Sequence, residues 1–246
     1  MRRLRQLLRR ALPPAPDPPR LDRPVFVIGD VHGRDDLLAA LLARIGSERI
    51  VLAGDLIDRG PQSAAVLARM RTATALAPER IFCLMGNHER MLLDALDAPE
   101  THGPRWLAHG GAETLASFGL PAEAGGGASA TERLESLRAA LPEGTEAWLR
   151  ARPLFWQEGP LGVTHAGADP ALPIAAQPEA ALLWGHRDFL RRPRSDGIWV
   201  AHGHTIVATP QAEAGRIAVD TGAWATGRLT AARIGPEGVS FLEQRG

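Results

Sequence analysis

The sequence is poor in cysteine and has no long apolar run. A single cysteine among 246 residues permits no internal disulfide, which favours a reducing compartment. Cys83 lies inside an apolar run, so we expect it to be buried in the core. No apolar run approaches the roughly 20 residues that a membrane span needs, and no cleavable signal is visible. The sequence therefore predicts a cytoplasmic protein.

The chain also lacks an excess of charge of either sign. Its 28 basic and 28 acidic residues balance, so no global field attracts nucleic acid, and no nucleic-acid partner is expected. Residues 1–10 are an exception because they are basic with leucines at helical spacing, and a proline-rich link follows at 12–20. We expect residues 1–20 to form a flexible tail that either contacts an anionic membrane surface or an acidic partner, or has no target.

Short apolar runs in the first half predict strands that are buried on both faces. They lie at residues 25–28, 50–53 and 81–85. A helix is predicted at 35–45, between the first two strands, so these strands should run parallel, with a right-handed crossover. The side chains that follow parallel strands gather at one edge of the sheet, where ligands bind in open α/β proteins.

The remainder of the chain is predicted to be helical at first and then mainly β. Helices are expected at 89–96 and 131–151, with a flexible break at the glycines 125–127. The segment 104–120 is interpreted either as a wall of a pocket or as a surface helical hairpin. Further strands are expected at 161–164, 198–201 and 217–219, and a closing hairpin at 229–234 and 239–242.

Five short motifs place Asp, Asn or His directly after apolar runs. They are GDVHG (29–33), GDLIDRG (54–60), GNHE (86–89), HAG (165–167) and GHT (203–205). One Gly-Asp pair after a strand is typical of an ordinary turn, but five such motifs need a common cause. Oxygen and imidazole ligands together suit Mn, Fe or Zn, and two such ions about 3.5–4 Å apart form a clamp for attack on phosphorus. The motifs therefore indicate a hydrolase of phosphate esters.

The order of these motifs resembles that of the phosphoprotein phosphatase branch of the calcineurin-like metallophosphoesterases, and within it the small bacterial and bacteriophage Ser/Thr protein phosphatases. The resemblance runs from about residue 25 to residue 242. It implies an α/β fold in which two mixed sheets form a β-sandwich flanked by helices, in four layers (α-β-β-α). Residues 21–246 would then be a single catalytic domain.

The resemblance also implies two divalent metal ions, with Mn favoured over Fe or Zn. Asp30 and His32 would bind the first ion, and Asp55 would bridge the two. The second ion would be held by Asn87, His165 and His204.

The catalytic roles that the resemblance implies fall on residues beside these ligands. A hydroxide bridging the ions would attack phosphorus in line, and His88 would protonate the leaving alkoxide as the general acid. Asp58 would hold the tautomer of His88 and raise its basicity. Arg59 and Asn87 would hold phosphate oxygens.

One position departs from the family's pattern. The family usually has a second phosphate-binding arginine two residues after a tryptophan, and here Trp184 is followed at that place by His186, with Arg187 one residue further. A histidine offers weaker phosphate capture than a guanidinium. Whether His186 or Arg187 takes over this role is left open at this point.

The remaining histidines have less defined roles. His202 lies two residues before His204, so on an extended strand both would point to the same face. His202 would then either support a metal ligand or pack in the core. His102 and His109 are expected at the surface.

The substrate class rests on two residues. Symmetrical dinucleoside polyphosphate hydrolases share the metal site but resemble GDxxARG and GNHD, whereas this chain has Asp58 and Glu89. We therefore expect phosphoserine or phosphothreonine in proteins as substrate, with phosphotyrosine and small phosphoesters open. The alternatives are dinucleoside polyphosphate hydrolysis and, because of His186, a catalytically weak phosphate-binding or scaffold protein.

Overall fold

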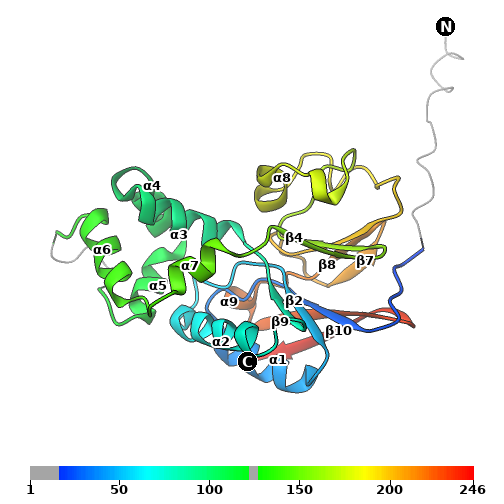
Figure 1. The fold of residues 1–246 in the computed structure, drawn as a ribbon, viewed down its shortest axis with the longest axis horizontal. Helices are drawn as coiled ribbons and strands as arrows, with labels where there is room; N and C mark the ends of the chain where they lie inside the picture. The colour runs from blue at the N-terminus through cyan, green and yellow to red at the C-terminus, as the bar shows by residue number, and fades with distance from the viewer. Residues whose placement is uncertain (1–16, 122–126) are drawn as a thin grey trace, which may run out of the picture.

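Two β-sheets lie face to face, and a group of helices extends from one end of them (Figure 1). The computed structural model describes residues 17–121 and 127–246. Most of the predicted tail lies outside the described residues, as do Gly125 and Gly126 of the predicted glycine break. In the part of the chain that is described, no helix is long and apolar enough to cross a membrane.

The first sheet has the strand order β10-β9-β1-β2-β3. Its strands are β1 (Val25–Ile28), β2 (Arg49–Leu52), β3 (Ile81–Cys83), β9 (Arg228–Gly235) and β10 (Gly238–Arg245). The pairs β1–β2 and β2–β3 are parallel, while β9 runs antiparallel to β1 and β10. The predicted parallel strands, the helix between the first two and the closing hairpin are thus confirmed.

The second sheet has the strand order β4-β5-β6-β8-β7. Its strands are β4 (Phe155–Glu158), β5 (Leu161–Thr164), β6 (Trp199–His202), β7 (Gln211–Glu213) and β8 (Arg216–Ala218). The three predicted strands of this half form its parallel centre, β5-β6-β8. The two edge strands were not predicted, because they are short and partly exposed and so carry no clear apolar pattern.

The alternating side chains of β1 fill two separate apolar layers. Val25 and Val27 pack between the two sheets. Phe26 and Ile28 point the other way, toward the helices α1 (Asp35–Ile45) and α2 (Ser63–Leu76). This arrangement explains why the predicted runs at 25–28 and 50–53 are apolar at every position.

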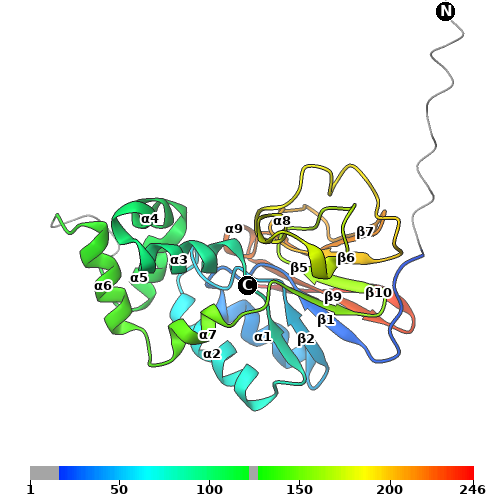
Figure 2. The same ribbon diagram turned by 45° about the horizontal axis from the view of Figure 1, so that its top comes forward.

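The outer face of the second sheet is covered more thinly. A small apolar cluster there includes Phe189 and Val200, and α8 (Glu179–Trp184) and the short 3-10 helix η2 (Ile174–Ala176) lie on this side (Figure 2). The predicted sandwich of two mixed sheets flanked by helices is confirmed.

The helices beyond the sheets connect β3 to β4 (Figure 1). They are α3 (Asn87–Asp97), α4 (Pro99–Trp106), the π-helical turn η1 (Leu107–Gly111), α5 (Ala112–Ser117), α6 (Ala130–Ala140) and α7 (Thr145–Arg150). The predicted helix 89–96 is confirmed as part of α3.

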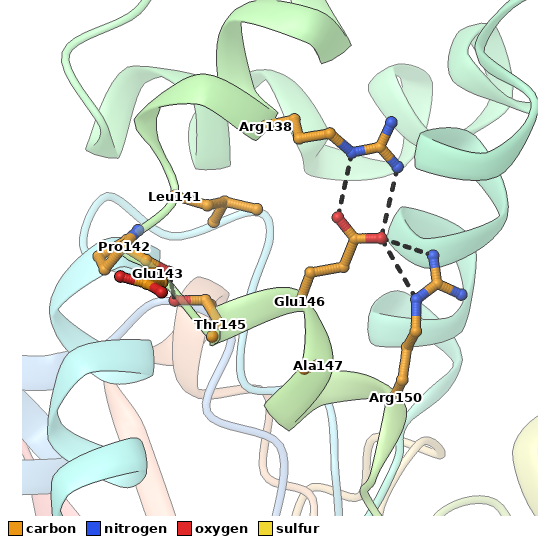
Figure 3. Close-up of a pocket in the computed structure, with 9 residues that line it drawn as sticks. Arg138, Leu141, Pro142, Glu143, Thr145, Glu146, Ala147 and Arg150 are labelled. Atoms are coloured by element: carbon orange, nitrogen blue, oxygen red, sulfur yellow. Dashed lines mark hydrogen bonds and ion pairs between the residues drawn. The ribbon is translucent and has the colours of Figure 1, made fainter.

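The prediction of one continuous helix at 131–151 is wrong. Helix α6 ends at Ala140, and α7 begins only at Thr145. Pro142 cannot donate a backbone hydrogen bond, and Gly144 adopts the left-handed φ of 78°, so the chain turns between the two helices. Figure 3 shows the surface pocket at this turn, where Glu146 pairs with both Arg138 and Arg150.

Candidate functional site

The carboxyl ends of parallel strands from both sheets bring the predicted metal ligands together. Asp30, Asp55 and Asn87 follow β1, β2 and β3, and His165 and His204 follow β5 and β6. Asn87 Oδ1 lies 2.7 Å from His165 Nε2 and 2.9 Å from His204 Nδ1. Asp30 accepts hydrogen bonds at 3.0 and 3.1 Å from the backbone N–H of His204. Ligands predicted from opposite halves of the chain are thus neighbours.

Asp55 lies between two groups of ligand atoms. One group consists of Asp55, His32 and His88, and the other of Asp55, His165 and His204. Within each group the ligand atoms lie within 4.8 Å of one another. Asp55 Oδ2 is 3.4 Å from His32 Nε2, whereas Asp55 Oδ1 is 3.4 Å from His165 Nε2. One carboxylate oxygen faces each group, which suits Asp55 as a bridging ligand.

The backbone selects the tautomers of two buried imidazoles. His32 Nδ1 donates to the carbonyl of Ile57 at 2.8 Å, and His165 Nδ1 donates to the carbonyl of Ala53 at 3.1 Å. Burial lowers the pKa of His32 to about 3 and that of His165 to about 4. Both rings are therefore neutral, and the Nε2 atom of each carries a free lone pair beside an oxygen of Asp55. This is the state in which histidine binds a metal ion.

Acidic side chains crowd around the same point. Burial, together with Asp220 and Asp55, raises the pKa of Asp30 well above its usual value. Burial also raises the pKa of Asp220 to about 6 and, with the help of Asp55, that of Glu89 to about 7. For Asp55 burial acts in the same direction, but His165 and two further imidazoles lower its pKa. Bound cations would relieve this repulsion, so the residues fit two divalent metal ions.

The backbone of the site is strained. Among the described residues other than glycine, six have a left-handed φ, and five of these are predicted site residues: His32, Asp55, Asp58, Arg59 and His204. Such a conformation costs roughly 1–3 kcal/mol per residue and persists only where the surrounding structure imposes it. The clustering of these residues supports a functional role for this edge of the sheets.

Glu89 holds the strained loops in place. Its buried carboxylate accepts hydrogen bonds from the backbone N–H groups of Gly86 (2.9 Å), Asp55 (2.9 Å) and Leu56 (2.8 Å). In the sequence, Glu89 stands out only as a marker of substrate class. The structure shows that it connects the second and third motifs.

Gly203 is required by close packing against Asp30. A Cβ atom at this position would overlap Oδ1 of Asp30. The glycine of the GHT motif therefore lets the chain that carries His204 approach the first motif.

His88 and Asp58 form a buried pair beside Asp55. His88 Nδ1 lies 2.7 Å from Asp58 Oδ2, and His88 Nε2 lies 3.9 Å from Asp55 Oδ2. Desolvation acts to lower the pKa of His88, but the two carboxylates outweigh it and the pKa is raised. With Nδ1 held by Asp58, Nε2 is the atom that faces the metal ligands. The pair can thus hold a proton next to the site.

Two side chains that the sequence analysis did not assign to the site fix Asp58. Thr114 Oγ1 donates to Asp58 Oδ1 at 2.7 Å, and Trp106 Nε1 donates to Asp58 Oδ2 at 3.1 Å. Both donors are fully buried. The segment 104–120 therefore supplies buried donors behind the His88–Asp58 pair from its inner face, while Arg105 and His109 on its other side are exposed. In the sequence, such a place was indicated only by one of the two interpretations of this segment, the wall of a pocket.

The structure assigns contacts to the candidate phosphate-binding residues. The Arg59 guanidinium stacks on Trp224, with Cζ 5.2 Å from the ring centroid. His186 is partly exposed, and its Nδ1 accepts from the backbone N–H of Asp188 at 3.3 Å. Arg187 is exposed. None of these contacts joins His186 or Arg187 to a candidate metal ligand, so phosphate binding by either residue stays a prediction.

His202 does not share a face with His204. Strand β6 ends at His202, and the φ of His204 is 60°, so the premise of an extended strand is wrong. The His202 ring packs edge-on against Phe189 at 4.9 Å, and its Nδ1 donates to the carbonyl of Gly203 at 3.0 Å. Packing is thus the role that the structure supports for His202.

The other isolated side chains lie where they were expected. His102 and His109 are exposed, and Cys83 is buried.

Comparisons with curated proteins find relatives of two activities. The chain is 38% identical over 93 residues to serine/threonine-protein phosphatase 1 of Salmonella typhimurium, which covers 36% of this chain and 39% of the relative. It is 30% identical over 172 residues to the symmetrical bis(5'-nucleosyl)-tetraphosphatase of Aromatoleum aromaticum, which covers 64% of this chain and 51% of the relative. The chain thus spans about two fifths of the length of the former and about half of the latter.

Solved structures share the fold. A putative diadenosine tetraphosphatase superposes with a TM-score of 0.65 at 21% identity, covering 93% of this chain and 96% of the other. A serine/threonine phosphatase from Saccharomyces cerevisiae superposes with a TM-score of 0.63 at 16% identity, covering 92% and 80%. At these identities the likeness establishes the fold alone.

The family assignment rests on a longer match. Residues 23–207 match the calcineurin-like phosphoesterase family, and this range contains all five motifs and every predicted metal ligand. The chain therefore belongs to the calcineurin-like phosphoesterase family.

Proposed function

We propose that this chain hydrolyses phosphomonoesters with two divalent cations, preferably Mn²⁺, and that its substrates are phosphoserine and phosphothreonine residues of proteins. The observation that carries the proposal is the buried His88–Asp58 pair, whose imidazole Nε2 lies 3.9 Å from the bridging candidate Asp55.

Six residues would hold the cations: Asp30, His32, Asp55, Asn87, His165 and His204. Cations bound there would activate a water molecule as the nucleophile and neutralise charge on the phosphoryl oxygens. Asn87 and Arg59 would also hold phosphate oxygens, as hydrogen-bond donors.

The role of His88 follows from the leaving group. The alkoxide that leaves from phosphoserine is strongly basic and has to be protonated as the bond to phosphorus breaks. The leaving phosphate of a dinucleoside polyphosphate is a weak base and needs no such donor. In this chain three buried groups, His88, Trp106 and Thr114, hydrogen-bond to the Asp58 carboxylate. Three hydrogen bonds that fix the partner of a general acid support a substrate whose leaving group needs a proton, which is a phosphomonoester with a poor leaving group.

A second candidate function is the hydrolysis of symmetrical dinucleoside polyphosphates. It is favoured by the relative of that name from Aromatoleum aromaticum, whose match covers 64% of this chain against 36% for the Salmonella protein phosphatase. The metal ligands are common to both functions, so only the leaving group separates them.

Turnover of defined substrates tests the proposal. The purified protein, loaded with Mn²⁺, is assayed with phosphoserine, phosphothreonine and phosphotyrosine peptides and with diadenosine tetraphosphate. We expect the highest kcat/KM for phosphoserine or phosphothreonine, and His88→Asn should abolish the advantage of these peptides. A higher kcat/KM for diadenosine tetraphosphate, little affected by His88→Asn, would establish the second function. No turnover of any substrate would leave a phosphate-binding or scaffold role.

A further inference from the structure

Trp224 lies at the edge of the candidate site and is one of the few large apolar side chains on the surface. It is 41% exposed and belongs to α9 (Ala223–Thr226), the short helix before β9. Strand β9 pairs antiparallel with β1, and the N–H of Gly29 donates to the carbonyl of Thr230. The chain before β9 therefore projects past the carboxyl end of β1, where Asp30 lies.

The helix that carries Trp224 is held firmly. Arg34 Nη1 donates to the carbonyl of Ala223 at 3.0 Å, and Thr226 Oγ1 donates to the carbonyl of Thr221 at 2.8 Å. The N–H of Gly222 donates to the Asp220 carboxylate at 2.8 Å. The indole is thus attached to a fixed backbone although its ring is partly in solvent.

Arg59 is held at its backbone by a different segment. Its φ is 66°, and its N–H donates to the carbonyl of Gly110 at 3.1 Å. A Cβ atom at Gly110 would lie 2.6 Å from the backbone nitrogen of Arg59, so only glycine permits this approach. The arginine backbone is therefore constrained from the side of η1.

The Arg59 side chain has a single contact that orients its head group. Within residues 17–121 and 127–246, no hydrogen bond or ion pair occupies its guanidinium, and the Trp224 ring lies 5.2 Å from Cζ. A cation–π contact uses none of the N–H donors of the guanidinium for a hydrogen bond, so these donors remain available. Those donors match two oxygens of a phosphate group. The sequence contains no lysine that could supply the charge instead.

We propose that Trp224 is a positioning residue for phosphate binding: its ring holds the Arg59 guanidinium so that the N–H donors face the phosphate of the substrate. This inference rests on the proposed function of Arg59 as a phosphate-binding residue. It assigns Trp224 an effect on phosphate affinity that acts through Arg59 and not through the metal ligands.

A double-mutant cycle with inorganic phosphate as the probe tests this. Trp224→Ala, Arg59→Ala and the double variant are compared for KM, kcat and inhibition by inorganic phosphate, and calorimetry measures phosphate binding without turnover. We expect Trp224→Ala to weaken phosphate binding about two- to fivefold, the change that a partly exposed cation–π contact corresponds to. Arg59→Ala should weaken it about tenfold or more. In the Arg59→Ala background, Trp224→Ala should have no further effect.

Two further variants control for unrelated effects. Trp224→Phe retains an aromatic face and should restore most of the phosphate affinity. Trp148→Ala removes another tryptophan that contacts an arginine, with Arg152 Cζ 4.4 Å from its ring centroid, and it belongs to α7, which carries no candidate site residue; it should leave phosphate affinity unchanged. Metal content should be the same in all variants.

The outcomes separate the inference from the function on which it rests. If Arg59→Ala weakens phosphate binding but Trp224→Ala does not, or if the two effects add fully in the double variant, then Trp224 does not act through Arg59. If Arg59→Ala itself leaves phosphate binding unchanged, the proposed role of Arg59 fails, and the positioning role of Trp224 fails with it.

Discussion

Replacing Thr114 by valine should remove one of the hydrogen bonds that hold Asp58 beside His88 and leave every candidate metal ligand unchanged. Valine has nearly the shape of threonine but removes the hydroxyl that donates to Asp58 Oδ1 at 2.7 Å and accepts from the Asp58 N–H at 3.0 Å. Both partners are buried, so water cannot replace the lost hydrogen bonds. The Asp58 carboxylate would then be left with His88 and Trp106 as partners, while the Asp58 N–H would keep Ser63 Oγ at 3.0 Å.

The size of the effect follows from the charge of the acceptor. A hydrogen bond to a buried charged group is worth about 1.5–3 kcal/mol, and about 1.4 kcal/mol corresponds to a factor of ten. We therefore expect Thr114→Val to lower the free energy of unfolding by about 1.5–3 kcal/mol. If the transition state in which His88 gives up its proton loses the same free energy of stabilisation, kcat for a phosphoserine peptide should fall by about ten- to a hundredfold.

The assay compares two leaving groups. Phosphoserine releases a strongly basic alkoxide, whereas an aryl phosphate such as p-nitrophenyl phosphate releases a stable anion, so only the former should suffer strongly from Thr114→Val. Thr114→Ser keeps the hydroxyl and is the matched control, with both activities near those of the unaltered protein. An equal loss of kcat for the two substrates, or a loss in Thr114→Ser as large as in Thr114→Val, would refute the reasoning.

Three further predictions concern the metal ligands and the phosphate. Excess chelator should abolish turnover, and Mn²⁺ should restore it better than Mg²⁺; full activity in chelator after dialysis would rule out the metal site. Asp55→Asn should lose bound metal and activity together, whereas His88→Asn should keep the metal but lower kcat by about 10²–10⁴, as elemental analysis and kinetics can check. If His186 binds phosphate, His186→Arg should lower KM. If Arg187 binds it instead, Arg187→Ala should raise KM. Unchanged kcat/KM in both variants and in the double variant would exclude this segment from the phosphate-binding site.

Much of the architecture is encoded locally. The apolar runs at β1, β2 and β3, the helical spacing between the first two and the closing hairpin could be predicted because each pattern extends over few residues. The candidate metal ligands could be proposed because they lie in short motifs that follow strands and resemble the family's motifs. The break between α6 and α7 was missed because the apolar spacing continued through Pro142 and Gly144.

The tertiary structure alone decided how these pieces act together. Asp58 accepts hydrogen bonds from Trp106 and Thr114, and Arg59 contacts the ring of Trp224. In each case the partners lie far apart in the sequence. Such contacts leave no periodic signal, because a hydrogen bond or a stacked ring depends only on where the folded chain places two side chains. The same holds for the pKa values of the buried acids, which depend on burial and on neighbouring charges. The sequence by itself determined which groups are candidates for binding metal and phosphate, and the fold decided which side chains surround them.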